Sequence, residues 1–369
     1  MKRNGLVNVL QKRIEDNINV YFPALTGKEI EVRGTPWGGV GTACTFRFKV
    51  KSKCNNQKYI VFAKVSPIFG NNNIGKLEYE ALKFVYPGIS SENSFYHVPR
   101  PLDFYRDYNA LLIEGVNGIC FRNLLLKFNS KLAGKDSLDY LESTMFKCGG
   151  WLQMFHSITK KGDRATFDLQ SFVSSFIEEI QLLEKFGFHK KTIEKIWKIF
   201  ECLKGIDKKI EMPVAMWHYD FTPGHVFISD DKVYVIDILG KEAPIYEDIG
   251  HWLASIAVVN AFPRYPFFDY ERVNTILGNR FLNGYYLQSN IQESVYFILS
   301  NIYKLKYLIE MFSEQHARVS QYTYSFVANL FSRFRLVRLF QRHILQTIDV
   351  ISERLDLLQK ALNIPARWV

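Results

Sequence analysis

The sequence lacks the cysteine pattern of a disulfide framework or a zinc site. It contains five cysteines, an odd number, and no two of them are spaced as CxxC. Scattered cysteines of this kind are typical of proteins kept in a reducing compartment. We therefore expect free thiols at Cys44, Cys54, Cys120, Cys148 and Cys202.

Long apolar runs, low-complexity segments and internal repeats are also missing. A membrane-spanning helix needs about 20 consecutive apolar residues, and the longest candidate, residues 249–262, is shorter and contains His251. The first 20 residues include Lys and Arg but not the apolar core of a secretory signal. We expect a cytoplasmic protein, with peripheral contact at the inner face of the membrane as a further hypothesis.

Apolar, aromatic and basic residues are abundant. Of 369 residues, 47% are hydrophobic and 15% aromatic, so the chain can build a large core, and its length suits two lobes. The formal net charge of +10 favours an anionic partner, such as a nucleotide or a phosphorylated sugar. We expect no nucleic-acid partner, because no recognisable binding module accompanies this charge.

The first part of the chain predicts an antiparallel sheet. Residues 29–34, 43–52 and 58–67 are rich in β-branched and aromatic residues and are separated by turn residues. A helix is predicted over residues 76–86, ended by Pro87, and two further strands over 101–106 and 109–115. Residues 1–114 are therefore expected to form a small lobe of five strands and one helix.

Beyond residue 114 the pattern changes to long amphipathic helices. Segments 137–158, 169–187 and 190–206 have helical periodicity, and so has the chain from residue 246 onward. The exception is residues 225–240, where "SDDK" predicts a tight hairpin turn between two strands. We expect an α+β protein in which a helical lobe, residues 115–369, carries one hairpin.

Phosphoryl transfer needs a backbone cradle for phosphates, a cation, metal ligands and a carboxylate that orients the attacking hydroxyl. The candidate cradle is Gly38, Gly39 and Gly41, although glycines between strands are more often a plain turn. Lys64, flanked by apolar residues, is the candidate cation. Glu78 on the following helix is its predicted partner.

The stretch "HYDFTPGHVF", residues 218–227, contains the candidate carboxylate for the attacking hydroxyl and a candidate metal ligand. Asp220 is predicted to orient the substrate hydroxyl, with His218 bracing the loop. After the Pro-Gly turn, His225 opens the hairpin, and Asp237 ends it. A carboxylate after a buried strand requires a cation partner, for which Mg²⁺ is the expected ion.

In order and spacing these residues resemble the aminoglycoside phosphotransferase and choline kinase family, which has a two-lobed protein-kinase-like fold. The resemblance runs from Gly34 to Ala254 and includes the later stretch "APIYEDIGHWLA". It implies an ATP-dependent enzyme with a small antiparallel-sheet lobe that binds nucleotide and a larger helical lobe.

The resemblance also implies roles for individual residues. Asp220 becomes the catalytic base, Asp237 a metal ligand, and Lys64 and Glu78 an ion pair on the nucleotide phosphates. The backbone from Glu114 to Val116 becomes the hinge that pairs with the adenine edge. Two residues are implied to have supporting roles, His156 as a structural residue and Asp248 as a brace of the catalytic loop.

One position departs from the family pattern. His225 stands where the family has a metal-ligating Asn. Because imidazole suits Mn²⁺ or Zn²⁺ better than Mg²⁺, the metal preference is open between Mg²⁺ and Mn²⁺. A nucleotide-binding pseudokinase or scaffold is the alternative hypothesis.

The leading prediction is phosphorylation of a hydroxyl on a non-protein acceptor, most simply a sugar or surface glycan, since "DFTPGHV" resembles family members of bacterial surface-glycan assembly. Glu242, Glu247 and Asp269 could instead bind a cationic acceptor, or could be solvated surface charge. A non-haem iron site of His218, Asp220 and a distant histidine is a less favoured alternative.

The basic, aromatic tail at residues 326–345 leaves two interpretations open. Its apolar residues recur at helical spacing with arginines between them. A helix that closes the helical lobe is the simpler interpretation. A helix lying on an anionic membrane is the other.

Overall fold

The computed structural model describes residues 3–38, 44–54, 57–66, 74–90, 94–130, 135–204, 207–259, 270–287, 293–321 and 326–361. It divides the chain into two compact units. The first contains residues 1–120 and 225–241, and the second contains residues 121–224 and 242–369. The hairpin that the sequence analysis placed with the helical lobe is thus grouped with the first unit.

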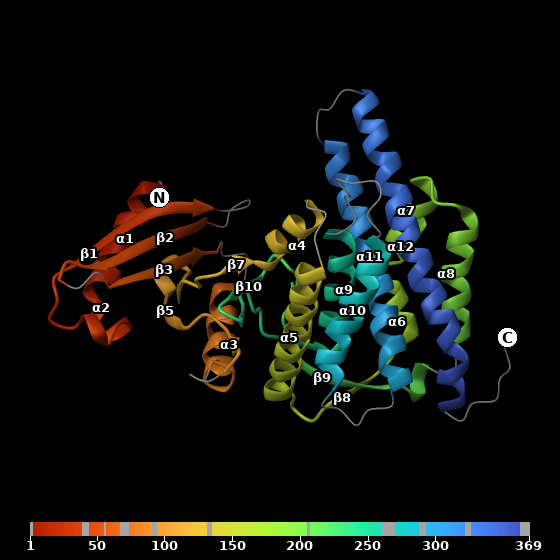
Figure 1. Ribbon diagram of the computed structural model, residues 1–369, viewed down its shortest axis with the longest axis horizontal. Coiled ribbons are helices and arrows are strands. Elements are labelled where there is room, and N and C mark those ends of the chain that lie inside the picture. Colours follow the sequence, from red (N-terminus) through yellow and green to blue (C-terminus); the bar gives the residue numbers. More distant parts are fainter. Residues whose placement is uncertain are drawn as a thin grey trace. The chain divides into compact units, whose positions relative to one another are not determined.

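The first unit is built around a five-stranded antiparallel sheet in the order β1-β2-β3-β6-β5 (Figure 1). Its strands are β1 (Ile30–Gly38), β2 (Cys44–Ser52), β3 (Lys58–Val65), β5 (Pro101–Tyr105) and β6 (Ala110–Glu114). The sequence predicted these five strands. Strand β6 lies between β3 and β5, so the strand order does not follow the chain order.

Alternation along β2 shows why these segments form a sheet. Phe46, Phe48 and Val50 are buried in one core, while Arg47 and Lys49 between them are more exposed. A period of two residues places successive side chains on opposite faces of a sheet. The buried face packs against α1 (Arg3–Asp16), α2 (Ile18–Tyr21) and the 3-10 turn η1 (Pro23–Leu25).

Helix α3 (Ile74–Ile89) corrects one prediction. The helix continues through Pro87 rather than ending before it. Pro87 lies in the last turn, where a missing N–H removes a single intrahelical bond, and the turn is closed by the N–H of Ser90 bonding to the carbonyl of Tyr86. Helices α1 and α2 were not predicted either.

A second sheet of the first unit has the order β4-β11-β10-β7. It joins β4 (Tyr96–His97) and β7 (Ile119–Cys120) to the hairpin strands β10 (Val226–Ser229) and β11 (Lys232–Val235). Outside this sheet, the 3-10 turn η2 (Arg106–Tyr108) precedes β6. Asp230 and Asp231 at the hairpin turn have φ of 46° and 68°. Two consecutive positive φ values give the hairpin turn that "SDDK" predicts.

The second unit is mainly helical, and Figure 1 shows α5 beside α10 and α11 beside α12, pairs that are in contact. The helices are α4 (Phe121–Ser130), α5 (Lys135–Thr159), α6 (Leu169–Ser174), α7 (Ile177–Lys185), α8 (Lys190–Leu203), η3 (Asp207–Lys209), α9 (Tyr246–Val259), α10 (Tyr270–Tyr286), α11 (Glu293–Gln321) and α12 (Phe326–Ala361). A sheet of order β12-β9-β8 accompanies them, formed by β8 (Arg164–Thr166), β9 (Glu211–Trp217) and β12 (Lys241–Pro244).

Two predictions for the helical segments are wrong in detail. The segment predicted as one helix over residues 169–187 is two helices, because the helix breaks at Ser175 and Phe176. Strands β8, β9 and β12 were not predicted, since each is short and has no long alternation.

The close crossing of α5 and α10 depends on glycine. A Cβ at Gly149 would overlap the carbonyl oxygen of Phe281, and one at Gly284 would overlap the carbonyl oxygen of Phe146. The two backbones therefore approach to a distance that only glycine permits at these positions. Rings of Trp151, Phe221 and Trp252 stack in the adjoining core.

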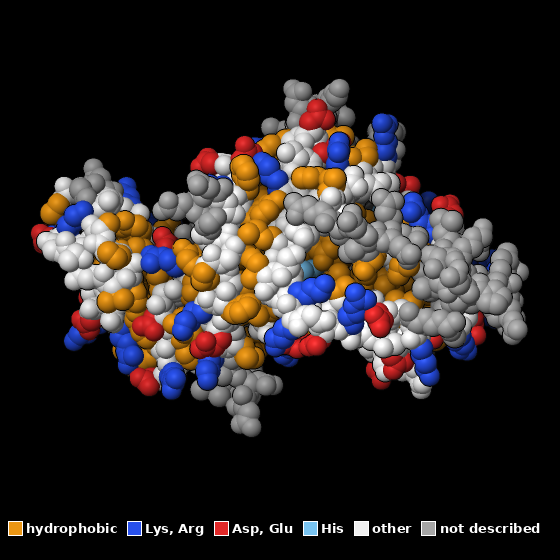
Figure 2. Space-filling model, turned by 90° about the horizontal axis from the view of Figure 1, so that it is seen from below, with side chains coloured by type: hydrophobic (Ala, Val, Ile, Leu, Met, Phe, Trp, Pro, Cys, Tyr) orange, Lys and Arg blue, Asp and Glu red, His pale blue; other side chains and the backbone are white. Residues whose placement is uncertain are grey.

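In the face drawn in Figure 2, basic and acidic side chains are interspersed, so the net charge of +10 is not gathered there into one stripe. Among the helices of the described ranges, none combines the length and apolar character needed to cross a bilayer.

Candidate active site

Lys64 lies on β3 of the first unit, and both of its partners are carboxylates. Its Nζ is 2.6 Å and 2.7 Å from the two carboxylate oxygens of Glu78 and 2.9 Å from Oδ1 of Asp237. The side chain of Lys64 is 22% exposed and that of Glu78 is 6% exposed. The structure thus brings together three of the predicted residues from β3, α3 and the segment after β11.

The protonation of this cluster follows from its burial and its charges. Burial by itself lowers the pKa of Lys64, but Glu78 and then Asp237 more than offset that effect, so the pKa is raised above its ordinary value. Burial raises the pKa of Glu78, and the charge of Lys64 opposes this rise. We conclude that Lys64 stays cationic and fixed in position before any ligand arrives.

Asp237 follows β11 in an unusual backbone conformation. Its φ is 67°, in the left-handed region that non-glycine residues seldom adopt. Such conformations cluster at functional sites. Oδ2 of Asp237 is 3.6 Å from Nε2 of His225, at the other end of the hairpin, and the N–H of Ile236 bonds to the carbonyl of His225.

The predicted hinge begins where β6 ends. The N–H of Glu114 donates to the carbonyl of Arg100, and its carboxylate accepts from Nε of Arg100 at 2.7 Å. The next N–H, of Gly115, donates to the carbonyl of Ile60 at 2.7 Å. Val116 lies after the strand and is half-buried. Gly38 ends β1, whereas Gly39 and Gly41 lie outside the described residues.

In the second unit, His218 is fully buried at the start of the loop that the sequence singled out. Its ring packs edge-on against Trp151 and Phe221, and its backbone N–H donates to Oδ2 of Asp248 at 3.0 Å. The same oxygen lies 3.1 Å from Nε2 of His156. Asp248 is thus bonded to the backbone of the loop and is itself in contact with His156, so these two buried residues support the loop.

Asp220 lies two residues further along the loop and is accessible. Tyr219 before it has φ of 79°, so the chain turns sharply at this point. The side chain of Asp220 is 45% exposed, and its Oδ1 is 3.9 Å from Nε2 of His251. A half-exposed carboxylate on a loop fixed by buried residues is suited to accept a proton from a bound hydroxyl.

His251, Lys306 and Tyr307 were not singled out as site residues from the sequence. The ring of His251 stacks on Tyr307, with centroids 4.4 Å apart. The hydroxyl of Tyr307 donates to Glu247 at 2.7 Å, and Nζ of Lys306 is 3.0 Å from both carboxylate oxygens of Glu247. Because residues 247, 248 and 251 are spaced at one helical turn, the spacing could have indicated a shared face.

The acidic residues considered for a cationic acceptor have different surroundings. Glu247 is largely buried and bonded to Lys306 and Tyr307. Glu242 is exposed and pairs with Lys161. Asp269 lies outside the described residues.

A cavity of about 810 Å³ in the second unit includes Asp220 and His251 in its lining. Its wall combines the loop residues Thr222, Pro223 and Gly224 with polar and charged residues from α11. The α11 contributors are Lys306, Tyr307, Glu310, Met311, Glu314, Gln315 and Arg318. The cavity is large enough for a small polar molecule.

Glu310 in this wall gives a prediction about pH. Burial, opposed by Lys306 and reinforced by Glu247, raises its pKa to about 7. A carboxyl whose pKa is higher in the folded state than in the unfolded state makes its full contribution to stability at a pH below the unfolded-state pKa. This contribution is lost as the pH rises through the folded-state pKa, here about 7. We expect Glu310→Gln to reduce the fall in melting temperature between pH 5 and pH 7.5, measured by thermal denaturation. An unchanged pH profile relative to the unsubstituted chain would contradict the burial of this carboxyl.

Comparisons with known proteins were made for sequence and structure. No protein-family model matches the sequence, and no curated protein matches it. Among solved structures, a glucosamine kinase is similar over 91% of this chain and 97% of its own, with a TM-score of 0.52 and 12% identity. A glucosamine kinase bound to glucosamine, ADP and inorganic phosphate is similar over 89% and 81%, with a TM-score of 0.51 and 14% identity.

The chain has a protein-kinase-like fold. This confirms the two-lobed α+β architecture expected from the sequence. A choline/ethanolamine kinase family protein from Mesorhizobium loti is also similar, at 12% identity and a TM-score of 0.49, over 91% of this chain and 98% of that one. At these identities the similarity establishes the fold, and the activity has to be argued from the residues.

The iron-site hypothesis requires three converging ligands. Within the ranges that the structure describes, no three His, Cys, Asp or Glu side chains gather into a metal-binding group. His218 is fully buried, and its backbone N–H donates to Asp248.

Proposed function

We propose that this protein transfers the γ-phosphoryl group of ATP to a hydroxyl of a small sugar or glycan acceptor. The observation that carries the proposal is the contact of Lys64 with both Glu78 and Asp237. Burying one cation between two carboxylates is costly unless the arrangement has a use, and polyphosphate binding provides one. A similar solved structure, glucosamine kinase, is bound to glucosamine, ADP and inorganic phosphate, which is consistent with this chemistry.

In this proposal the first unit binds the nucleotide. Lys64, held by Glu78, neutralises phosphate charge, and the backbone from Glu114 to Val116 offers polar groups to the adenine edge. Asp237 would hold the divalent metal ion, which neutralises charge on the transferring phosphate when bound. A single carboxylate fits Mg²⁺, because Mg²⁺ is commonly bound by one or two carboxylates together with water and substrate phosphates.

The second unit positions the acceptor. Asp220 accepts or orients the proton of the attacking hydroxyl, and the cavity of about 810 Å³ at Asp220 holds the rest of the acceptor. Its lining contains both carboxylates and basic side chains, together with Tyr307 and Gln315, so it offers donors and acceptors to a polyhydroxylated ligand. The charged lining balances the carboxylates of Asp220, Glu310 and Glu314 with the cations Arg122, Lys306 and Arg318, so this mixed polar surface suits a sugar and has no excess of negative charge for a purely cationic molecule.

The decisive test is transfer of labelled γ-phosphate to a panel of acceptors. The panel contains amino sugars, neutral sugars, aminoglycosides, choline and glycolipid extracts, each with Mg²⁺ or Mn²⁺. We expect label on one sugar-containing class and none on choline. No transfer to any class, together with no nucleotide-dependent thermal shift with either metal, would contradict the proposal.

A nucleotide-binding pseudokinase is the second candidate, and His225 is the observation that favours it. Nε2 of His225 lies 3.6 Å from Oδ2 of Asp237, so the imidazole lies next to the carboxylate that is expected to bind the metal ion. Under this hypothesis the protein binds nucleotide and transfers nothing. A thermal shift with ATP in the absence of any labelled product would favour it.

Substitution at His225 tests how this residue sets the metal preference of the phosphotransferase. Because amide oxygen suits Mg²⁺ better than imidazole nitrogen does, we expect His225→Asn to raise Mg²⁺-supported turnover relative to Mn²⁺-supported turnover by about 10-fold. Phosphoryl transfer is measured over a series of concentrations of each metal. An equal effect on both metals would show that His225 acts only on the position of Asp237.

A further inference from the structure

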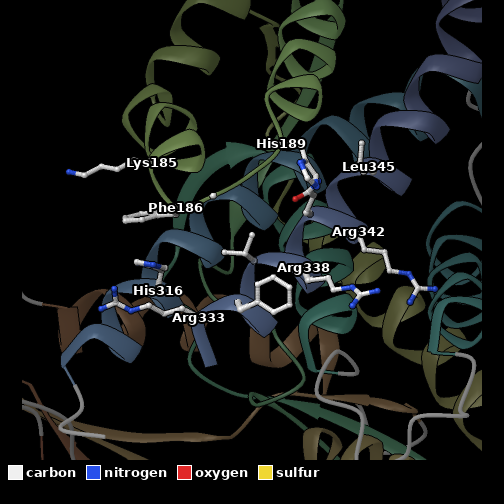
Figure 3. Close-up of a pocket in the computed structure, with 12 residues that line it drawn as sticks. Lys185, Phe186, His189, His316, Arg333, Arg338, Arg342 and Leu345 are labelled. Carbon is white, nitrogen blue, oxygen red and sulfur yellow. The ribbon is translucent and has the colours of Figure 1, made fainter. Parts of the chain in front are cut away.

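A second large cavity lies in the helical unit, away from the residues of the proposed reaction. It has a volume of about 1000 Å³ and is bordered by the end of α7, the loop before α8, α11 and α12. Figure 3 shows His316 beside Phe186 on one side of this cavity and Arg338 and Arg342 on the other. Neither the fold nor the proposed reaction explains a hollow at this place.

The lining of this cavity has charge of one sign. Four lining residues are Lys or Arg, two are His, and none of the described lining residues is Asp or Glu. The basic members are Lys185, His189, His316, Arg333, Arg338 and Arg342. By contrast, the cavity at Asp220 contains Glu310 and Glu314 beside its basic residues. A concave surface lined by one sign of charge concentrates oppositely charged ligands.

The arginines of α12 are spread around the cavity. Arg338 and Arg342 lie about one helical turn apart on one face of α12, whereas Arg333 lies about 14 Å from Arg342 along the axis and roughly halfway round the helix. Arg342 pairs with Glu271 of α10, while no carboxylate of the described residues lies within salt-bridge distance of Arg338. Burial, and then the charge of Arg333, lower the pKa of His316, and Figure 3 shows these two side chains on one side of the cavity, across from Arg338 and Arg342. An elongated ligand with several anionic groups matches cations that are spread in this way.

Aromatic faces lie among these cations. Phe186 and His316 stack with centroids 3.6 Å apart and an interplanar angle of 24°. Phe334, also in the lining, is 65% exposed. Sugar rings present apolar C–H faces to aromatic rings, and anionic substituents at their edges can reach guanidinium groups.

We propose that this cavity binds an anionic oligosaccharide, independently of the phosphotransferase activity. The concave shape argues against a flat bilayer, because the lining residues come from several elements around a hollow. In addition, α12 buries Leu336, Phe340 and Ile344 within the helical unit, so this face of the helix is not available to lipid. The helix therefore serves as one wall of a binding site as well as part of the core.

The test uses a sulfated hexasaccharide as the probe, with uncharged maltohexaose as its neutral counterpart. We expect the chain of 369 residues to bind the sulfated probe in calorimetry and not the neutral one, with an affinity that falls as salt is raised. Arg338→Glu is expected to weaken binding about 10-fold, because a like charge is placed against the ligand.

Arg335→Glu is the matched control, since it makes the same charge change on the same helix outside the cavity lining. We expect it to change affinity less than about twofold. Equal losses for the two variants would overturn the site, because they would show attraction by net charge alone. Binding to vesicles containing phosphatidylglycerol, or to oligothymidylate, with no binding of the sulfated probe would overturn the proposed ligand. Neither variant removes a residue assigned to phosphoryl transfer, so the labelled-phosphate assay remains an independent measurement.

Discussion

Replacing Asp220 by Asn is expected to abolish most phosphoryl transfer while leaving nucleotide binding nearly unchanged. The amide cannot accept the proton of the acceptor hydroxyl, and general-base catalysis of this kind contributes about 100- to 10,000-fold to rate. The loop itself should persist, because it is held by His218 and Asp248 rather than by the carboxylate of Asp220. Steady-state transfer and the nucleotide-dependent thermal shift are the two measurements.

Asp139→Asn provides the matched control for this substitution. Asp139 is exposed on α5 in the same unit, so its replacement makes the same change in charge and size. We expect no change in transfer from this variant. A loss of nucleotide binding in Asp220→Asn as large as the loss of turnover would indicate a folding defect and contradict the assigned role.

Much of the candidate site could be predicted because its residues have recognisable local contexts. Lys64 is a lone cation in an apolar strand, and Asp220 lies in a His-x-Asp stretch before a hairpin. Asp237 follows the second hairpin strand. In each case an alternation of apolar and polar residues, typical of a strand, lies next to a turn, and such short patterns can be recognised in a sequence.

The remaining features depend on packing, which sequence periodicity does not report. The stacking of His251 on Tyr307 joins α9 to α11, through two residues that lie 56 positions apart in the chain. The strand order that places β6 beside β3 is likewise a nonlocal choice. The lining of the basic cavity is nonlocal as well, because it comes from four segments, and only the arginines of α12 could be noticed in the sequence.

Replacing Lys64 by Ala is expected both to destabilise the protein and to remove nucleotide binding. Removing one partner of a buried ion pair leaves an uncompensated charge, which costs about 3 to 5 kcal/mol of unfolding free energy. Glu78 would be left as a buried carboxylate without its cation, because its side chain is only 6% exposed. The loss should be smaller at low pH, since burial raises the pKa of Glu78 and a protonated carboxyl needs no cation.

The double substitution Lys64→Ala with Glu78→Gln separates stability from function. Neutralising Glu78 removes the uncompensated charge, so we expect the double variant to recover about 1 to 3 kcal/mol of the lost unfolding free energy. Nucleotide binding should not return, because the cation that neutralises the phosphates is still missing. Lys58→Ala, at the exposed start of the same strand, is the control for loss of a lysine from β3. If the double variant regained a nucleotide-dependent thermal shift, Lys64 would be a structural residue, and the proposed nucleotide site would have to be placed elsewhere.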